Sequence, residues 1–173
     1  MDTGAQDHKL PRWLVRIAIG SDPVRTLTRV AVLILLSLVV FNFVLWPIKV
    51  DGISMLPTYH EGNVNFINRL AFLFRPPHRG DIVSIRYAGK HRMLLKRVIG
   101  LPGETVAFHD GHLVINGQPM EEPYVKYQCD WEIPAEQVGP GEYYVVGDNR
   151  SMPDAGHVKG RATRDRIMGK VLL

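Results

Sequence analysis

The sequence contains a single cysteine, Cys129, so neither an internal disulfide nor a cysteine-based zinc site can form. The histidines are scattered, and none has the His-x-x-x-His or His/Asp pairing that is typical of a metal site or a Ser-His-Asp triad. Low-complexity tracts and internal repeats are also missing. With 173 residues, 46% of them hydrophobic, the chain has the composition of one globular domain with an appendage.

The net charge of +4 is modest, and its distribution is more informative than its size. A basic surface suits either nucleic acid or an anionic membrane. Several basic residues cluster directly before a long apolar run, namely Lys9, Arg12, Arg16, Arg25 and Arg29. We therefore expect a lipid bilayer as a partner and no nucleic acid.

The apolar run from Val30 to Trp46 reads VAVLILLSLVVFNFVLW and contains no charge. With its flanks it approaches the ~20 residues that cross a hydrocarbon core, which predicts a membrane anchor over residues 27–48. A buried soluble helix would usually keep a polar stripe, and a cleaved signal would have a shorter leader and a small-x-small site. The basic residues before the run predict a cytoplasmic N-terminus. Residues 1–26 would be either an amphipathic surface helix or a disordered tail.

Residues 49–173 read as β structure. Turn signals such as His109-Asp110-Gly111-His112 separate short segments rich in β-branched and aromatic residues. The fold class is therefore predicted as mainly β, with antiparallel coiled sheets around one core. RLAFLFRPP, residues 69–77, is predicted as a short core helix, with an apolar tip on the bilayer as the alternative. The predicted strands are NVNFIN, DIVSIRY, RMLLKRVIGL, ETVAFH, HLVING, YYVVGD and GKVLL.

Two groups stand out chemically. Ser54 lies in GISMLPT, where Gly52 and Pro57 can hold it on a constrained turn. Lys96 lies in an apolar strand, on the face of Leu94 and Val98, so burial should lower its pKa and let it act as a base for a serine. The alternatives are an ordinary loop serine, a lysine that extends its ammonium to water, and His60 as the base.

With both groups in view, the chain resembles the type I signal peptidases, which are membrane-bound Ser-Lys proteases. The match runs in order through GISMLPT, RGDIVSIRY, KRVIGLPGE and GDNRSMPD and covers about residues 27–173. The resemblance implies a β-fold catalytic domain outside the cytoplasmic membrane. It also implies cleavage after small residues at positions −1 and −3 of an exported protein's leader, with no metal or cofactor.

The resemblance implies roles residue by residue. Ser54 would be the nucleophile, with its backbone N–H as an oxyanion donor, and Lys96 the general base. Gly52 stands where some family members carry a hydroxyl for the oxyanion. The candidate walls of the substrate pockets are Val50, Met55, Leu94 and Leu95.

The segment GDNRSMPD matches the family less closely at its end. Gly147 would let the backbone pass close to Lys96, whereas Pro153 stands where the family has a hydroxyl that orients the lysine. Ser151 is the candidate substitute, and Asp154 matches the family aspartate if one residue is deleted. Further residues expected to support the site are Asn149 and Arg150.

Arg97 follows the proposed base and points to the opposite face of the strand. A guanidinium cannot lose its charge there, so it should bind a carboxylate. Asp148 is the partner that the resemblance implies.

The expected partners are exported preproteins that bear signal peptides, the bilayer, and the secretion translocon. The expected location is the cytoplasmic or inner membrane, crossed once. The first rival is a Ser-Lys protease of narrow specificity that processes conjugation or pilus proteins. The other rival is an inactive membrane-tethered domain that only binds peptides. Self-cleaving repressor proteases share the dyad, but the anchor argues against them.

Overall fold

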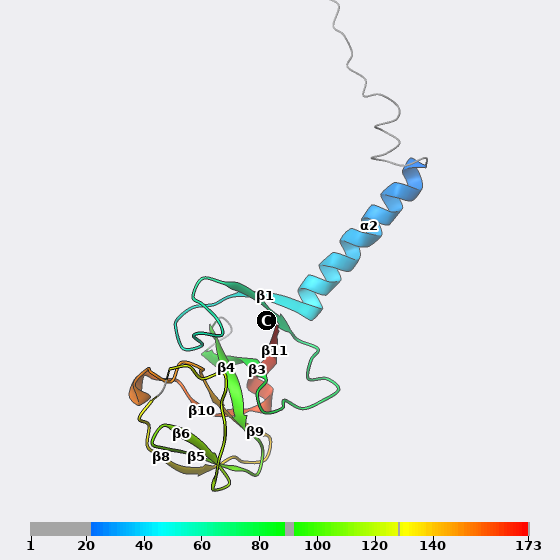
Figure 1. The fold of residues 1–173 in the computed structure, drawn as a ribbon. Helices are drawn as coiled ribbons and strands as arrows, with labels where there is room; N and C mark the ends of the chain where they lie inside the picture. The colour runs from blue at the N-terminus through cyan, green and yellow to red at the C-terminus, as the bar shows by residue number, and fades with distance from the viewer. Residues whose placement is uncertain (1–21, 89–91, 128, 173) are drawn as a thin grey trace, which may run out of the picture. The chain divides into compact units, whose positions relative to one another are not determined.

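The computed structural model describes residues 22–88, 92–127 and 129–172 (Figure 1). The chain divides into two units, residues 1–40 and 41–173, which we describe separately. In the first unit, α2 (Pro23–Val39) starts at the N-cap Asp22, whose carboxylate accepts hydrogen bonds from the backbone N–H groups of Val24 and Arg25. With the π-helical turn that follows, Val40–Val44, it forms a 22-residue apolar helix that is long enough to cross a membrane. The interpretation of residues 1–21 as an amphipathic or disordered tail lies outside the described residues.

The second unit contains a larger sheet of seven strands, in which every pairing is antiparallel. The strands are β1 (Leu45–Lys49), β2 (Val64–Asn68), β3 (Ile82–Ala88), β4 (Arg92–Gly100), β9 (Glu142–Val146), β10 (Gly160–Thr163) and β11 (Ile167–Leu172). Their spatial order is β1-β2-β11-β3-β4-β9-β10. Strand β4 therefore lies between β3 and β9, in the interior of the sheet (Figure 1).

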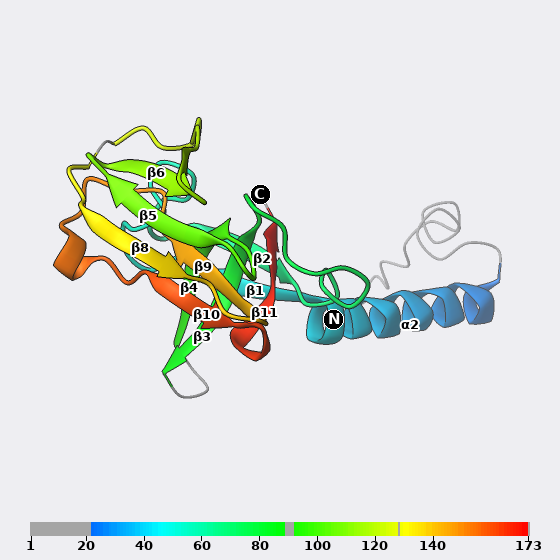
Figure 2. The same cartoon turned by 90° about the horizontal axis from the view of Figure 1, so that it is seen from below.

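A smaller sheet has the order β7-β6-β5-β8 and is seen in Figure 2 beside the larger one. Its strands are β5 (Thr105–His109), β6 (His112–Ile115), β7 (Gln118–Pro119) and β8 (Ile133–Gln137). The predicted hairpin joins β5 to β6: His109 pairs with His112, and Asp110 and Gly111 have φ values of 47° and 75°. Those positive φ values are what a tight primed turn requires, and glycine adopts them without steric cost.

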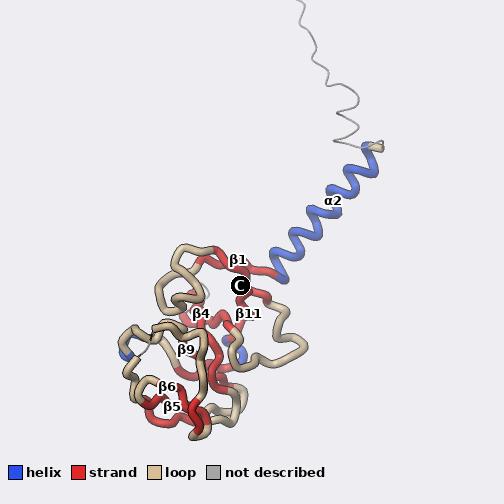
Figure 3. The backbone as a smooth tube through the Cα atoms, viewed as in Figure 1, coloured by secondary structure: helices blue, strands red, loops and turns tan. Residues whose placement is uncertain are grey.

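The buried side chains form three clusters. One lies between the smaller sheet and the adjoining strands and includes Phe108, Trp131 and Tyr144. The second lies on one face of the larger sheet and includes Val83, Val98 and Val145. The third gathers residues around the segment that carries Ser54, and its buried members are Val50, Met55, Tyr59, Ile67, Ile82 and Val171. The prediction of a mainly β fold with antiparallel sheets and one N-terminal apolar helix is confirmed, and Figure 3 shows how strands and loops dominate this unit.

All seven predicted strands are present, but the end of the apolar run and residues 69–75 differ from the prediction. The end of the run forms β1 rather than helix, because its residues pair with β2, where Leu45 lies opposite Asn68. Residues 69–75 form turns, so the predicted core helix is wrong. The Asn68 side chain accepts a hydrogen bond from the backbone N–H of Leu70, and only Phe72 of the apolar residues in this segment is deeply buried.

Gly100, at the end of β4, generates a prediction about how the two sheets meet. A Cβ at this position would lie 2.4 Å from the Val106 side chain on β5 and 2.9 Å from Tyr144 Cβ on β9. We expect Gly100→Ala to lower the free energy of unfolding by about 1–3 kcal/mol, the usual cost of overpacking a core. Gly156→Ala is the matched control, because nothing lies within 4 Å of its Cβ position. Equal stability of the two variants in chemical unfolding would contradict close packing at Gly100.

Candidate active site

Ser54 lies on a tight sequence of turns between β1 and β2. Gly52 has a φ of 88°, a conformation that a side chain would disfavour, as the sequence predicted. The backbone N–H of Leu56 donates to the Ile53 carbonyl at 3.2 Å, and that of Tyr59 donates to the Met55 carbonyl at 2.9 Å. The Ser54 residue is half-buried. These bonds hold Ser54 on a constrained segment, and Ser54 still lines a pocket.

That pocket has a volume of about 70 Å³. Ser54 lines it together with the four residues expected to form substrate pockets, which are Val50, Met55, Leu94 and Leu95. Val50 and Met55 are buried, and the two leucines are half-buried. The structure therefore brings the serine and these apolar side chains to one small concave surface.

Lys96 is 2% exposed and lies on β4 opposite Val83 of β3. It lines a neighbouring pocket of about 90 Å³, and Leu94 lines both pockets. Burial lowers the pKa of Lys96 to about 8, although the carboxylate of Asp148 acts in the opposite direction. The predicted direction of this pKa shift is confirmed, and its cause is the apolar surroundings that the strand pattern indicated.

Gly147 follows β9, the strand that pairs with β4, and lies against the segment that carries Ser54. A Cβ on this glycine would lie 2.2 Å from the Ser54 carbonyl oxygen and 2.9 Å from two ring atoms of His157. The Ser54 carbonyl also accepts a hydrogen bond from the backbone N–H of Asn149 at 3.0 Å. Because Val146 pairs with Arg97, the chain leaves β9 directly beside Lys96. Only a residue without a side chain allows this close approach.

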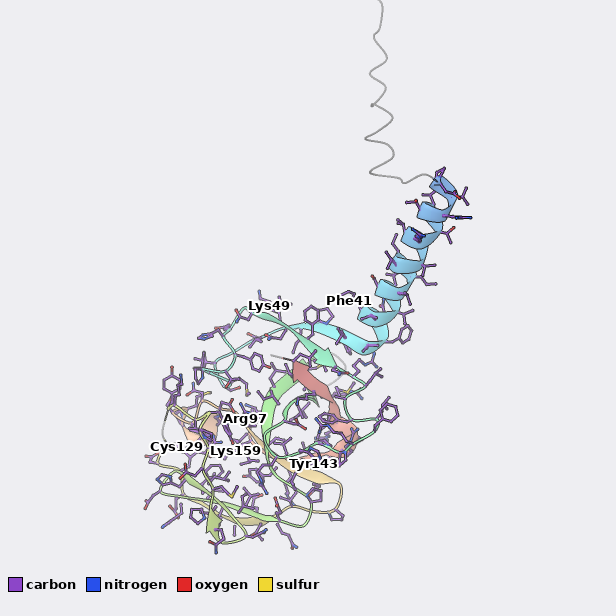
Figure 4. All side chains as sticks on the ribbon, turned by 45° about the vertical axis from the view of Figure 1, so that its right-hand side comes forward. Phe41, Lys49, Arg97, Cys129, Tyr143 and Lys159 are labelled. Atoms are coloured by element: carbon purple, nitrogen blue, oxygen red, sulfur yellow. The ribbon has the colours of Figure 1, made fainter. Side chains whose placement is uncertain are left out.

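The predicted partner of Arg97 is confirmed. Arg97 Nε and Nη2 donate to the two carboxylate oxygens of Asp148 at 2.8 and 2.6 Å, and Nη1 donates to the Gly80 carbonyl at 2.9 Å. Asp148 is fully buried and also accepts a hydrogen bond from the Thr58 hydroxyl. Burial opposes the charge on Arg97, but Asp148 raises its pKa above the ordinary value. The pair therefore holds β4, the turn after β9 and the Ser54 segment together. Figure 4 labels Arg97 among the side chains of this unit.

Arg150 forms a second buried ion pair, which the sequence did not reveal. Its guanidinium donates to both carboxylate oxygens of Glu122 and to the Gly147 carbonyl. The Tyr124 hydroxyl donates to Glu122 at 2.6 Å, and the Arg97 guanidinium lies 3.8 Å above the Tyr124 ring. The only sequence signal was a pair of adjacent glutamates, Glu121 and Glu122, with nothing to indicate which one turns inward.

The remaining expected residues lie as follows. The Asn149 side-chain amide donates to the Ile53 carbonyl at 3.1 Å and so supports the serine segment. Ser151 is exposed, and its hydroxyl bonds to the Asn149 side chain at 2.7 Å, so the hydroxyl is engaged there rather than on the lysine. Asp154 begins a 3-10 turn, and its side chain lies outside what the structure describes. Among the described residues, no group of His, Cys, Asp and Glu side chains could hold a metal ion.

Comparison with known proteins places this geometry in context. A family model described as "Signal peptidase, peptidase S26" matches residues 24–173. Signal peptidase I V of Bacillus subtilis (strain 168) is 38% identical over 131 residues, which make up 68% of this chain and 77% of that protein. Signal peptidase I of Leptolyngbya laminosa is 33% identical over 148 residues, or 81% and 73% of the two chains. A crystal structure of a signal peptidase I from Enterococcus faecalis V583 aligns with a TM-score of 0.45 at 27% identity, covering 57% of this chain and 98% of that one.

The Arg97–Asp148 pair leads to a prediction for a double-mutant cycle. Arg97→Ala and Asp148→Ala should each lower the free energy of unfolding by about 3–5 kcal/mol, because each leaves an unpaired buried charge. The double variant should lose less than the sum of the two, since neither charge is then unpaired. Chemical unfolding of the full chain in detergent measures all three. Arg161→Ala, which removes a half-exposed guanidinium, should cost less than about 1 kcal/mol. Strictly additive losses would contradict the buried pair.

Proposed function

The chain belongs to the signal peptidase S26 family, and on that premise we propose that it is a membrane-bound serine endopeptidase that uses Ser54 and Lys96 to remove signal peptides from exported preproteins. The observation that carries the proposal is the burial of Lys96 on β4. A lysine with a pKa near 10.5 is neutral in only about one molecule in three thousand at pH 7, whereas a pKa of about 8 makes about one in ten neutral. A base for the serine is thus available without a histidine.

The reaction follows from the chemistry of these two groups. Neutral Lys96 accepts the hydroxyl proton as Ser54 Oγ attacks the scissile carbonyl. The resulting ammonium gives this proton to the leaving amine when the C–N bond breaks, which leaves an acyl-enzyme on Ser54. Lys96, neutral again, deprotonates a water that hydrolyses the ester. The backbone N–H of Ser54 is the candidate donor to the oxyanion.

The small size of the pocket beside Ser54 supports a preference for small residues. Drug-sized ligands need pockets of roughly 300 Å³ or more, whereas the pocket beside Ser54 measures about 70 Å³. It would accept the side chain of alanine or serine at position −1 and reject an aromatic ring. Position −3 of an extended peptide points to the same side as position −1, since successive side chains alternate. The same side of the site would therefore select both positions.

We also propose the arrangement in the cell. The apolar helix Pro23–Val44 would cross the membrane once, the residues before it would stay in the cytoplasm, and the residues from β1 onward would form the peptidase domain outside, so that the span would end before residue 48. The apolar helix and the basic residues before it support this orientation. Leader peptides arriving from the secretion translocon would then meet Ser54 close to the bilayer, since only a short segment follows the apolar run before GISMLPT.

The dyad is tested by cleavage of a leader-bearing preprotein, with sequencing of the product's new N-terminus. Ser54→Ala and Lys96→Met should each abolish cleavage, and the double variant should be no worse, because the two groups act as one unit. His60→Ala, which alters the rival base, should retain activity. Changing position −1 of the substrate from alanine to phenylalanine should prevent cleavage by the unmodified protein.

Lys96→Met should also be more stable than the parent. Burial of a group with a lowered pKa disfavours its protonated form, so the folded state loses about 3 kcal/mol at pH values below 8, and stability rises between about pH 8 and the ordinary pKa of 10.5. An inactive but stabilised variant would support the role of the buried lysine. A destabilised Lys96→Met would indicate that the ammonium forms an ion pair with a carboxylate.

The orientation is tested separately by adding a protease to intact spheroplasts. We expect digestion of the domain after Lys49 and protection of the N-terminal residues, because the basic flank remains in the cytoplasm. Detergent lysis is the control that exposes both parts. Protection of residues 49–173 in intact cells would reverse the orientation and exclude the proposed substrates.

A further inference from the structure

His157 is a buried polar side chain without a partner. It is 4% exposed, and neither ring nitrogen has a hydrogen-bond partner among the described residues. Buried polar atoms are almost always paired, because leaving water without a new hydrogen bond is unfavourable. An unpaired imidazole in a well-packed domain therefore calls for an explanation in terms of a contact that forms during function.

The imidazole ring of His157 lies between Trp131 and Gly147, and Gly147 in turn lies against the Ser54 segment. The ring packs against Trp131 edge to face, with centroids 5.0 Å apart. On another side it lies against Gly147, whose Cβ position is 2.9 Å from ring atoms Cε1 and Nε2 and 2.2 Å from the Ser54 carbonyl oxygen. The glycine that lets the serine segment approach thus also makes room for the imidazole.

The charges around the ring keep it neutral. Burial, reinforced by the cations of Lys96 and Arg150, lowers the pKa of His157 to about 4, so Lys96 lies within electrostatic range of the ring. Glu122 is paired with Arg150, and the Lys159 ammonium lies 5.1 Å from the centre of the Trp131 ring. Backbone groups of Asn149 and Val158 favour the protonated ring but do not reach hydrogen-bonding geometry with its nitrogens. A neutral imidazole always carries one nitrogen that can accept a hydrogen bond.

We propose that His157 is a positioning residue for Lys96: its unprotonated nitrogen accepts a hydrogen bond from the lysine side chain, directly or across one water, and so holds Nζ toward the Ser54 hydroxyl. This role rests on the proposed function of Lys96 as the base. It gives the buried ring the partner that it otherwise lacks. It also supplies an orienting group that Ser151 does not, since that hydroxyl bonds to Asn149.

The test compares His157→Phe, which keeps an aromatic ring against Trp131 but has no acceptor, with His157→Gln, which restores an acceptor oxygen. Cleavage of a preprotein by the full chain in detergent is measured at about pH 9.5, where Lys96 is neutral in every variant, so that a difference reports positioning. We expect kcat/KM to fall about 10- to 100-fold in His157→Phe and to recover at least partly in His157→Gln. The melting temperature of each variant is the folding control, and a value near that of the parent shows that a loss of activity does not come from unfolding. His112→Phe, an exposed histidine on β6, is the control that should match the parent.

A second readout does not depend on cleavage. In the Ser54→Ala background, the pKa of Lys96 is followed by NMR of 13C-labelled lysine. Loss of an acceptor for the ammonium should lower this pKa by about one pH unit when His157→Phe is added. Parent-like activity, or an unchanged Lys96 pKa in His157→Phe, would overturn the proposal and leave His157 with a packing role. Absence of cleavage by the unmodified protein would instead refute the proposed function, and the NMR titration would still decide the contact.

Discussion

The site depends on one constraint: β4 buries two adjacent cations on opposite faces and treats them in opposite ways. Arg97 pairs with a carboxylate and remains charged, whereas Lys96 has no carboxylate within hydrogen-bonding distance among the described side chains, and burial lowers its pKa to about 8. The alternation of side chains along a strand makes this separation possible. A shift of the register by one residue would exchange the two environments and leave a charged guanidinium in the apolar one.

The same ion pair determines where the serine lies. Asp148 bonds to Arg97 on β4 and to Thr58 in the segment of Ser54, and the next residue, Asn149, bonds to the Ser54 carbonyl. Arg150 continues the network through Glu122 and Tyr124 back to the face of Arg97. Two nearby groups, Lys96 and His157, are buried at a cost in stability. The paired network offsets this cost and holds both in place, as is common where function requires unfavourable burial.

Much of this arrangement could be predicted from local patterns. Alternation identified the faces of β4, and turn residues located the β5–β6 hairpin. The need to pair a buried guanidinium predicted a carboxylate for Arg97, and the family resemblance implied that this carboxylate was Asp148. Hydropathy could not show where the helix ends and β1 begins, because apolar residues are compatible with both a helix and a strand. Pairing with β2 determines that residues 45–49 form a strand. Strands β8 and β10 lack the β-branched runs that reveal a strand, and they form because neighbouring strands offer hydrogen bonds.

The parts that the sequence could not provide all depend on contacts between distant residues. Glu122 meets Arg150 across a loop, so nothing nearby in the sequence distinguishes it from Glu121. Only the folded structure shows that the ring nitrogens of His157 are buried without a hydrogen-bond partner. From the sequence alone, a histidine in a glycine-rich turn would ordinarily be taken as solvated. Ser151 was the plausible hydroxyl by position, yet its bond to Asn149 turns it away. Local rules therefore predicted most of the strands and suggested Ser54 and Lys96 as reactive groups, whereas tertiary packing determines which other groups surround them.

The pH dependence of kcat/KM for preprotein cleavage tests the central claim, which is that a buried lysine supplies the base. This ratio reports the free enzyme, so it should rise about tenfold per pH unit at low pH and level off above a midpoint near the pKa of about 8. The midpoint should persist in His60→Ala. A midpoint near about 6.5 would indicate an imidazole base. A rise that continues to the ordinary lysine pKa of 10.5 would show that burial does not make Lys96 available at neutral pH, which would contradict the account.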